Sequence, residues 1–279
     1  MSEQQKKAER FLALHHSPAP LVLPNVWDVS SAMIFALEGF KAIGTTSAGV
    51  AATLGYADGQ EMTLADNLSV VERIARNTSL PVSADMESGY ATSVDGVVTC
   101  ARAVLESGAV GLNLEDSTGT AKTPLFDKTE QQEKIKAIRA MNDSQDMHLV
   151  INARTDAYLV GNDDGDCLRS AIDRGNAYRE AGADCIFVPD VGNLDKAAIR
   201  TLVDEIDAPI NVIAGANTPT IGELQSIGVA RVSLGPRPMR AVLSLLRRIA
   251  KELAEAGTYE LMSEASISYD EVNEWFSRK

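Results

Sequence analysis

Eight short apolar segments, evenly spaced and separated by longer amphipathic segments, constrain the fold of this 279-residue chain more than any other feature. Most are rich in β-branched residues and continuously apolar, which is typical of parallel strands covered on both faces. The predicted strands are residues 21–26, 41–45, 80–84, 110–114, 148–153, 184–188, 209–213 and 230–234. Strict alternation of strands and helices at about 35 residues per unit predicts an α/β fold, and favours a closed (β/α)8 TIM-type barrel over an open doubly wound sheet.

The segments between the strands have the features of helices. The clearest are residues 94–106, 130–141, 167–181, 197–206 and 239–256, and several end on a glycine just before the next strand, where a helix C-cap favours left-handed backbone. No GxGxxG follows the first strand and no GxxxxGK[ST] occurs, which disfavours a nucleotide-binding fold. We expect one barrel domain over residues 1–279, with residues 259–279 as a C-terminal helical extension that packs at a subunit interface.

The charge balance excludes some classes of partner. The chain has 26 Lys and Arg against 39 Asp and Glu, a net charge of −13, so we expect neither nucleic acid nor an anionic membrane as a partner. We also expect no signal peptide, because residues 1–10 are polar, and no bilayer span, because no apolar run approaches about 20 residues. Cys100, Cys167 and Cys185 are an odd number with long spacings, which favours the cytoplasm.

Charged side chains follow several predicted strands, at the barrel end where such folds carry their chemistry. Asp85 and Glu87 follow the third strand, Glu115 follows the fourth, Arg154 follows the fifth, and Asp58 lies in the loop after the second. Carboxylates gathered this closely repel one another unless a cation lies among them. Oxygen ligands without nearby His or Cys favour Mg²⁺, with Mn²⁺ possible.

Arg154 is suited to a bidentate grip on a substrate carboxylate, and the backbone N–H groups of residues 46–49 can add contacts to an anion. Purely structural roles are also possible for these charged residues. Arg154 can instead pair with Asp156 or Glu115, and a single Asp after a strand is most often a helix cap or turn residue. We assign Asp28, Asp95, Asp156 and Asp190 to that second class. Gly215 and Gly235 are alternative candidates for a phosphate-binding loop.

Four motifs resemble the isocitrate lyase/phosphoenolpyruvate mutase superfamily, most closely its small mutase-like bacterial branch. They read TTSAGVAATLGYADG, SADMESGYA, GLNLEDS and INARTDAYL, and the resemblance extends from residue 24 to residue 235. The resemblance implies a (β/α)8 barrel, a homotetramer whose eighth helix is exchanged between subunits, and bound Mg²⁺. It also implies a small α-oxocarboxylate, or its enolate, as the anionic substrate.

The resemblance also implies roles for individual residues. Asp85 would bind the metal directly. Glu87 stands where the family usually has Asp, and with Glu115 and Asp58 would hold metal-bound water. The residues expected to grip the substrate carboxylate and carbonyl are Thr46, Ser47, Ala48, Arg154 and Asn211. We expect Asp85, Glu87 and Glu115 as the metal-binding set, and Asp58, Glu115 and Arg154 as the catalytic set.

Besides Glu87, the sequence departs from the family in three places. Residues 117–126 contain neither Cys nor His, whereas isocitrate and methylisocitrate lyases carry a KKCGH segment there. Ser117 stands where the mutases have Lys, and Ala214 stands where the lyases have Glu. We therefore expect a Mg²⁺-dependent lyase or decarboxylase that cleaves a C–C bond of a small α-oxocarboxylate or related diacid. The alternatives are a non-catalytic oxocarboxylate-binding protein and a phosphonopyruvate-directed mutase or hydrolase.

Overall fold

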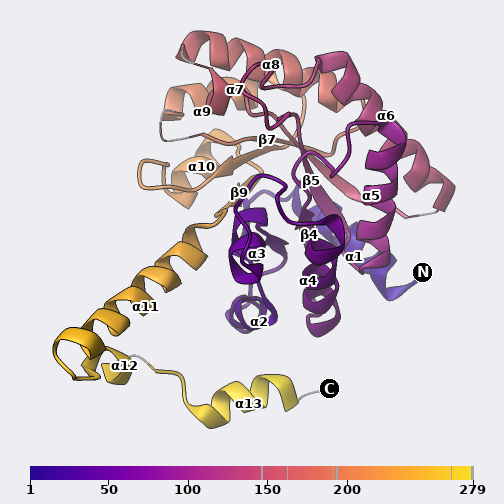
Figure 1. Ribbon diagram of the computed structural model, residues 1–279. Helices are drawn as coiled ribbons and strands as arrows, with labels where there is room; N and C mark the ends of the chain where they lie inside the picture. The colour runs from indigo at the N-terminus through magenta and orange to yellow at the C-terminus, as the bar shows by residue number, and fades with distance from the viewer. Residues whose placement is uncertain (146, 162, 191, 193, 265, 278–279) are drawn as a thin grey trace. The chain divides into compact units, whose positions relative to one another are not determined.

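The computed structural model describes residues 1–145, 147–161, 163–190, 192, 194–264 and 266–277. The chain divides into two compact units, residues 1–235 and residues 236–279. The first unit is a nearly closed barrel of parallel strands with helices around it, which confirms the predicted TIM-type fold (Figure 1).

Within the described residues, nine short strands form a single sheet in the order β1-β9-β8-β7-β6-β5-β4-β3-β2. They are β1 (Leu21–Leu23), β2 (Asn25–Val26), β3 (Ile43–Thr45), β4 (Val82–Asp85), β5 (Gly111–Glu115), β6 (Val150–Arg154), β7 (Cys185–Val188), β8 (Ile210–Ile213) and β9 (Arg231–Ser233). Every neighbouring pair is parallel, as the continuously apolar segments predict.

The first predicted strand, residues 21–26, is two strands in the structure. Pro24 lies between them and has no N–H for the ladder, although its carbonyl still accepts a hydrogen bond from Gly44 at 2.9 Å. β1 pairs with β9 and β2 pairs with β3, so the two pieces together close the barrel. The Asn25 side chain reinforces this seam, because its Oδ1 accepts the N–H groups of Leu234 and Gly235, each at 2.8 Å.

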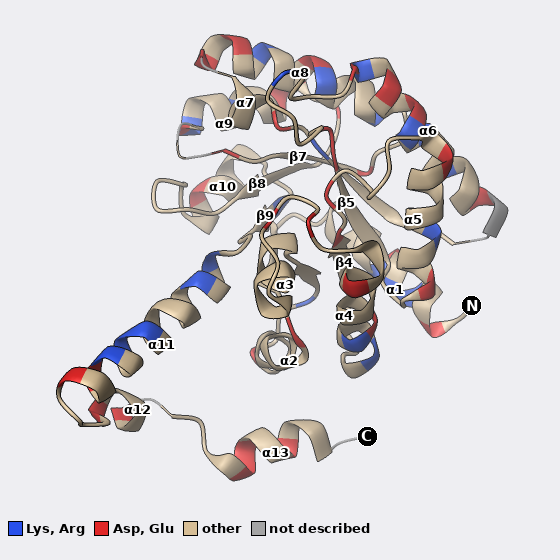
Figure 2. Ribbon diagram, in the orientation of Figure 1, with Lys and Arg blue, Asp and Glu red and all other residues tan. Residues whose placement is uncertain are grey.

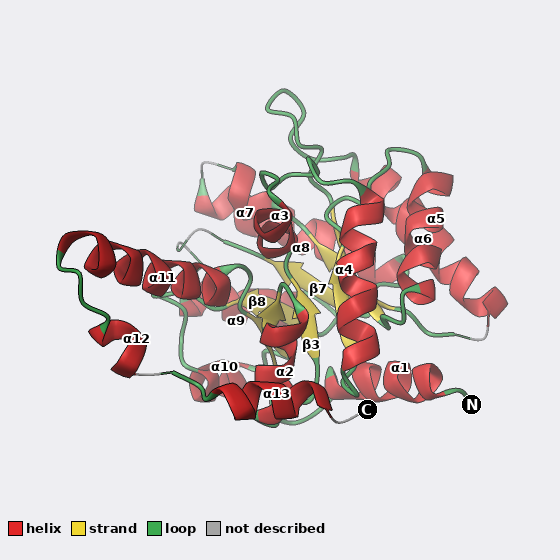
Figure 3. Ribbon diagram, turned by 60° about the horizontal axis from the view of Figure 1, so that its bottom comes forward, coloured by secondary structure: helices red, strands yellow, loops and turns green. Residues whose placement is uncertain are grey.

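Helices surround the strands in the first unit (Figure 3). They are α1 (Glu3–Leu14), α2 (Val29–Leu37), α3 (Ser47–Leu54), α4 (Leu64–Asn77), α5 (Val94–Glu106), α6 (Lys128–Gln145), α7 (Ala157–Val160), α8 (Asp164–Glu180), α9 (Lys196–Glu205) and α10 (Ile221–Ile227). The predicted helix 94–106 coincides with α5. Gly39, Gly108, Gly182 and Gly228 have positive φ, as the predicted helix ends require.

Helix α1 covers the barrel end at which the strands begin. Its buried Phe11 clusters with Leu21, Val110 and Val150, which lie at or next to strand starts. A Cβ on Gly111 would lie 2.6 Å from the Phe11 ring, so only glycine allows this approach. The opposite end, where the strands finish, carries the charged side chains.

Alternation along the strands divides apolar from polar side chains. Leu112, Leu114, Ile151 and Ala153 belong to the main apolar core. Residues at the alternate positions of β5 and β6 are polar, namely Asn113, Glu115, Asn152 and Arg154, and the first three are buried. Successive strand side chains point to opposite faces, so these polar side chains lie on the inner face of the barrel. Glu115 and Arg154 are neighbours in the register.

The second unit consists of α11 (Arg237–Glu255), α12 (Glu260–Glu264) and α13 (Tyr269–Ser277). Large apolar side chains are exposed along α11, among them Val242, Leu243, Leu245 and Leu246. In the part of the chain that the structure describes, no helix combines the length and the apolar character that crossing a bilayer requires.

Candidate active site

Acidic residues and one arginine lie at the ends of β4, β5 and β6, where the ribbon of Figure 2 is coloured by residue charge. Asp85 is the last residue of β4, Glu115 is the last residue of β5 and Arg154 is the last residue of β6. Asp85, Glu87 and Glu115 are 7%, 5% and 9% exposed, respectively. These three carboxylates are therefore buried, unlike carboxylates on the protein surface.

The carboxylate of Asp85 is held from two sides. The backbone N–H of Ser47, at the start of α3, donates to Asp85 Oδ2 at 2.8 Å. On the other side, Asn113 Nδ2 donates to Asp85 Oδ1 at 3.2 Å. A carboxylate has about four lone-pair positions, so two donors leave Asp85 able to accept a cation as well.

Glu87 lies in a turn with left-handed backbone, at φ +50°. Left-handed backbone is uncommon for residues other than glycine and is found preferentially at functional sites. Burial, together with the negative charges of Asp85 and Asp58, raises the pKa of Glu87 to about 7. Asp58 is itself exposed, but it is close enough for its charge to act on the site.

Arg154 is clamped between two buried carboxylates. Its NH1 lies 2.8 Å from Glu115 Oε2, and its NH2 donates to Asp156 Oδ2 at 2.9 Å while Nε donates to Asp156 Oδ1. Burial works against the charged guanidinium, but Glu115 and Asp156 together raise the pKa of Arg154. Burial also disfavours the charged form of Glu115 and so raises its pKa, while the positive charge of Arg154 acts to lower it. Arg154 is thus a fixed cation at the rim.

Asp116 connects this clamp to the base of the following loop. It is fully buried, and its Oδ1 accepts the N–H of Asp156 at 2.9 Å. Its Oδ2 accepts from Arg174 NH1 at 3.0 Å and from the Tyr178 hydroxyl at 2.7 Å. Arg174 NH1 also donates to the carbonyl of Phe126 at 3.0 Å, so the end of loop 117–127 is attached to the same network.

The start of α3 lies beside Asp85. Thr46 and Ser47 are buried and Ala48 is partly exposed. The N–H groups of a helix's first turn lack partners within the helix, so this turn can donate to an anion, although the Ser47 N–H already donates to Asp85. A Cβ on Gly49 would lie 2.6 Å from Thr46 Cγ2 and 3.0 Å from Trp27 Cβ, so the turn requires glycine there.

Asn211 lies on β8 within the barrel, and its amide nitrogen and oxygen have no hydrogen-bond partner among the described residues. Buried amides are nearly always paired with protein or water, so Asn211 is available to a ligand or to water.

The carboxylates do not form a closed metal cage. Within the described residues, no three His, Cys, Asp or Glu side chains lie close enough together to hold a metal ion by themselves. A site completed by water and substrate oxygens fits Mg²⁺, which keeps several waters and takes one or two carboxylates. Beside burial, the negative charges of Asp85 and Asp58 raise the pKa of Glu87, so a cation among these carboxylates would be stabilised.

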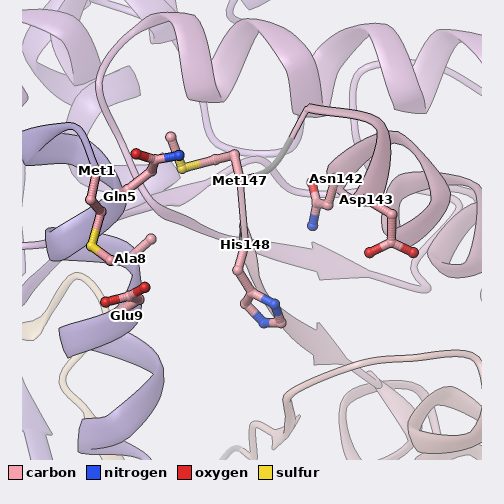
Figure 4. A pocket seen from close by; sticks show the side chains of 8 residues that line it. All are labelled: Met1, Gln5, Ala8, Glu9, Asn142, Asp143, Met147 and His148. Carbon is pink, nitrogen blue, oxygen red and sulfur yellow. The ribbon is translucent and has the colours of Figure 1, made fainter.

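A separate pocket of about 580 Å³ lies near the opposite end of the barrel (Figure 4). Its lining residues are Met1, Gln5, Ala8, Glu9, Asn142, Asp143, Met147 and His148. His148 precedes β6, so this pocket is remote from the strand ends that carry Glu115 and Arg154. None of the predicted site residues lines it.

The expected pairing of Arg154 with Asp156 or Glu115 is confirmed for both carboxylates. Asp156 is buried, and its side chain makes no hydrogen bond that caps α7. Three other residues of the site region carried no expectation from the sequence. Asn113 donates a hydrogen bond to Asp85, and Asp116 accepts one from the backbone N–H of Asp156. Arg231 donates to Asn113 from β9. The two-residue spacing of Asn113 and Glu115 on one strand was the signal that could have found Asn113.

The chain matches the sequence profile of the phosphoenolpyruvate phosphomutase family over residues 11–254. It is 36% identical to the Mycobacterium tuberculosis protein Rv1998c over 88% of this chain and 89% of that protein. It is 31% identical to 2-methylisocitrate lyase of Escherichia coli, over 91% of this chain and 87% of the lyase. The crystal structure of a Burkholderia cenocepacia J2315 protein of the lyase/mutase type superposes with a TM-score of 0.91 at 34% identity, over 99% of this chain and 97% of that one. The chain therefore belongs to the phosphoenolpyruvate phosphomutase family, within the isocitrate lyase/phosphoenolpyruvate mutase superfamily that its strand-end motifs resemble.

Proposed function

We propose that this enzyme is a Mg²⁺-dependent lyase or decarboxylase that cleaves a C–C bond next to the carbonyl of a small α-oxocarboxylate or related diacid. One observation carries the proposal: the half-buried Arg154 is held by two carboxylates, and one of them, Glu115, lies next to Asp85 and Glu87 at the neighbouring strand end. Such a site offers one region to an anion and another to a cation. A metal-bound oxocarboxylate presents both kinds of charge.

Asp85 would hold Mg²⁺ directly, with Glu87, Glu115 and Asp58 orienting its waters. When bound, the metal supplies Lewis-acid stabilisation of negative charge on the substrate's carbonyl oxygen. Support for Mg²⁺ comes from the oxygen-only donor set. It also comes from phosphonopyruvate hydrolase, a protein of the same fold at 22% identity, whose structure contains oxalate and Mg²⁺.

The chain's own groups orient the substrate. Arg154 presents a planar guanidinium whose position is set by two carboxylates, so it can bind a substrate carboxylate without losing further side-chain freedom. The first turn of α3 and Asn211 add hydrogen-bond donors that need no rearrangement as charge develops. Phe187 is 5% exposed, and the centre of its ring lies 5.8 Å from the guanidinium carbon of Arg154, so it gives the site an apolar wall.

Loop 117–127 contains neither Cys nor His, which disfavours a reaction that needs such a side chain in this segment as the general acid. Ser117 pairs with Leu125 in an isolated bridge, and the loop's polar side chains include the hydroxyls of Thr118, Thr120 and Thr123, which contact one another. A decarboxylation or retro-aldol cleavage needs the charge-stabilising site but less proton delivery from a loop. The same loop favours a second candidate, a protein that binds oxocarboxylates without turning them over.

The test measures pyruvate release from a panel of oxodiacids and 2-alkylmalates, with and without Mg²⁺. We expect release that requires Mg²⁺ and disappears in Asp85→Ala but persists in Asp95→Ala, a control in the first turn of α5. Undiminished turnover in Asp85→Ala would refute the proposal. Oxalate binding without turnover of any panel member would favour the non-catalytic candidate, and a product from phosphonopyruvate alone would favour a mutase or hydrolase.

We further propose that residues 236–279 pack against another subunit of a homotetramer, because α11 exposes several large apolar side chains. The proposal includes a cytoplasmic location. Its support is that Cys100, Cys167 and Cys185 are all buried and unpaired.

A further inference from the structure

One guanidinium lies inside the barrel, away from the rim. Arg231 is the first residue of β9 and is 1% exposed, which places it among the largest fully buried side chains. Its guanidinium carbon lies 5.9 Å from the centre of the Phe11 ring. Its NH2 donates to Asn113 Oδ1 at 3.3 Å, while Nε and NH1 have no partner among the described residues. No ion pair in the described part of the chain includes Arg231.

A buried charge without an ion-pair partner is expensive to maintain. Burial lowers the pKa of Arg231 to about 10, with Cys185 and Asp85 acting in the opposite direction, so the guanidinium is still protonated at neutral pH. Burial also raises the pKa of the Cys185 thiol to about 12, which leaves that side chain neutral. Asp85 is therefore the acidic side chain that acts on the charge of Arg231.

A short chain of hydrogen bonds connects the two. Asn113 Oδ1 accepts from both Arg231 NH2 and Asn152 Nδ2, the latter at 2.7 Å. This fixes the amide so that its Nδ2 donates to Asp85 Oδ1. Given the dimensions of an amide group, the guanidinium nitrogen lies within about 9 Å of the Asp85 carboxylate.

We infer that Arg231 is a buried countercharge of the active site, whose field strengthens the binding of an anionic substrate and weakens the binding of the divalent cation. The inference rests on the proposed function, which takes a cation and an oxocarboxylate as the two ligands. Across about 10 Å of protein, one buried charge changes affinity by about tenfold for each unit of ligand charge. Because the charge is buried, salt screens it little.

The two ligands give this inference a signature that a structural role lacks. Loss of the charge should tighten cation binding and weaken anion binding, whereas local disorder in the barrel should weaken both. Arg231→Met removes the charge and retains an unbranched apolar side chain, and Arg231→Lys retains the charge. Circular dichroism and thermal unfolding establish that each variant is folded.

The experiment titrates Mn²⁺ into metal-free protein, followed by electron paramagnetic resonance, and oxalate into Mg²⁺-saturated protein, followed by calorimetry. In Arg231→Met we expect Mn²⁺ to bind at least about tenfold more tightly and oxalate at least about tenfold more weakly. Arg231→Lys should remain near the wild-type values for both. Changes of the same sign in Arg231→Met, or no change, would overturn the inference.

A second variant keeps the test decisive if Arg231→Met does not fold. Cys185→Asp places a carboxylate where the present side chain already interacts with Arg231. It should neutralise the field with the same pair of opposite shifts, and unchanged affinities would count against the inference. Failure of the proposed function is distinguishable, because in that case the wild-type protein itself binds neither Mn²⁺ nor oxalate.

Discussion

Replacing Glu87 with glutamine in the metal-free protein tests whether the rim is held in an electrostatically unfavourable state. Glu87 is 5% exposed, and burial with the charges of Asp85 and Asp58 raises its pKa from the ordinary 4.5 to about 7. Below pH 4.5 the group is protonated in both the folded and the unfolded chain, so nothing is lost. As the pH rises from 4.5 to 7, the unfolded chain releases the proton first and the free energy of unfolding falls.

Each pKa unit corresponds to about 1.4 kcal/mol, so above pH 7 the ionised Glu87 lowers the free energy of unfolding by about 3 kcal/mol. Gln resembles the protonated side chain and avoids this loss. We expect Glu87→Gln to be more stable than the wild type by about 3 kcal/mol at pH 8 in EDTA, but by less than about 1 kcal/mol at pH 5.

Urea unfolding followed by circular dichroism at the two pH values measures this difference. The exposed Glu106→Gln is the matched control and should show no pH-dependent gain. Saturating Mg²⁺ should narrow the gap, because a ligand that binds the folded wild type stabilises it. A gain for Glu87→Gln that is equal at pH 5 and pH 8 would refute the electrostatic reasoning.

Three further predictions concern the clamp, the α3 turn and the second unit. Arg154→Lys keeps the charge but loses the planar fork, so oxalate should bind at least about tenfold more weakly in calorimetry, and wild-type affinity would contradict the clamp's role. Gly49→Ala should lower the free energy of unfolding by about 1–3 kcal/mol in a thermal scan, because the added Cβ meets Trp27. In the control Gly222→Ala in α10, the added Cβ meets nothing within 4 Å, so this variant should be as stable as the wild type or more stable. Leu246→Glu on α11 should reduce the assembled mass in light scattering, and a monomeric wild type would exclude the subunit contact.

The fold was predictable because the strands are short, continuously apolar and separated by helices with recognisable ends. The way in which β1 and β2 close the barrel was less predictable. Residues 21–26 form one apolar segment, and only the pairing partners of β1 and β2 divide it at Pro24. Which strands lie beside a given segment depends on the closed sheet rather than on the segment's own residues.

The site was predictable where the side chain itself names its chemistry. Asp85, Glu115 and Arg154 stand at strand ends, and the barrel brings strand ends together. For Asp156 the sequence leaves two roles open, because Asp after a strand is most often a cap but Arg154 lies two residues before it, and the structure shows the pairing with Arg154. Arg231 had no signal, because nothing in its local sequence reveals that β9 buries it opposite Asn113.

The seam at β1 has a consequence for how the chain is made. Leu21–Leu23 pair with Arg231–Ser233, so one edge of the growing sheet stays without its neighbour until about 230 residues have been synthesised. An unpaired edge of this kind is open to pairing with another chain. We expect the nascent protein to be most prone to aggregation in the interval before residue 235 leaves the ribosome, when Asn25 acquires the backbone N–H groups of Leu234 and Gly235.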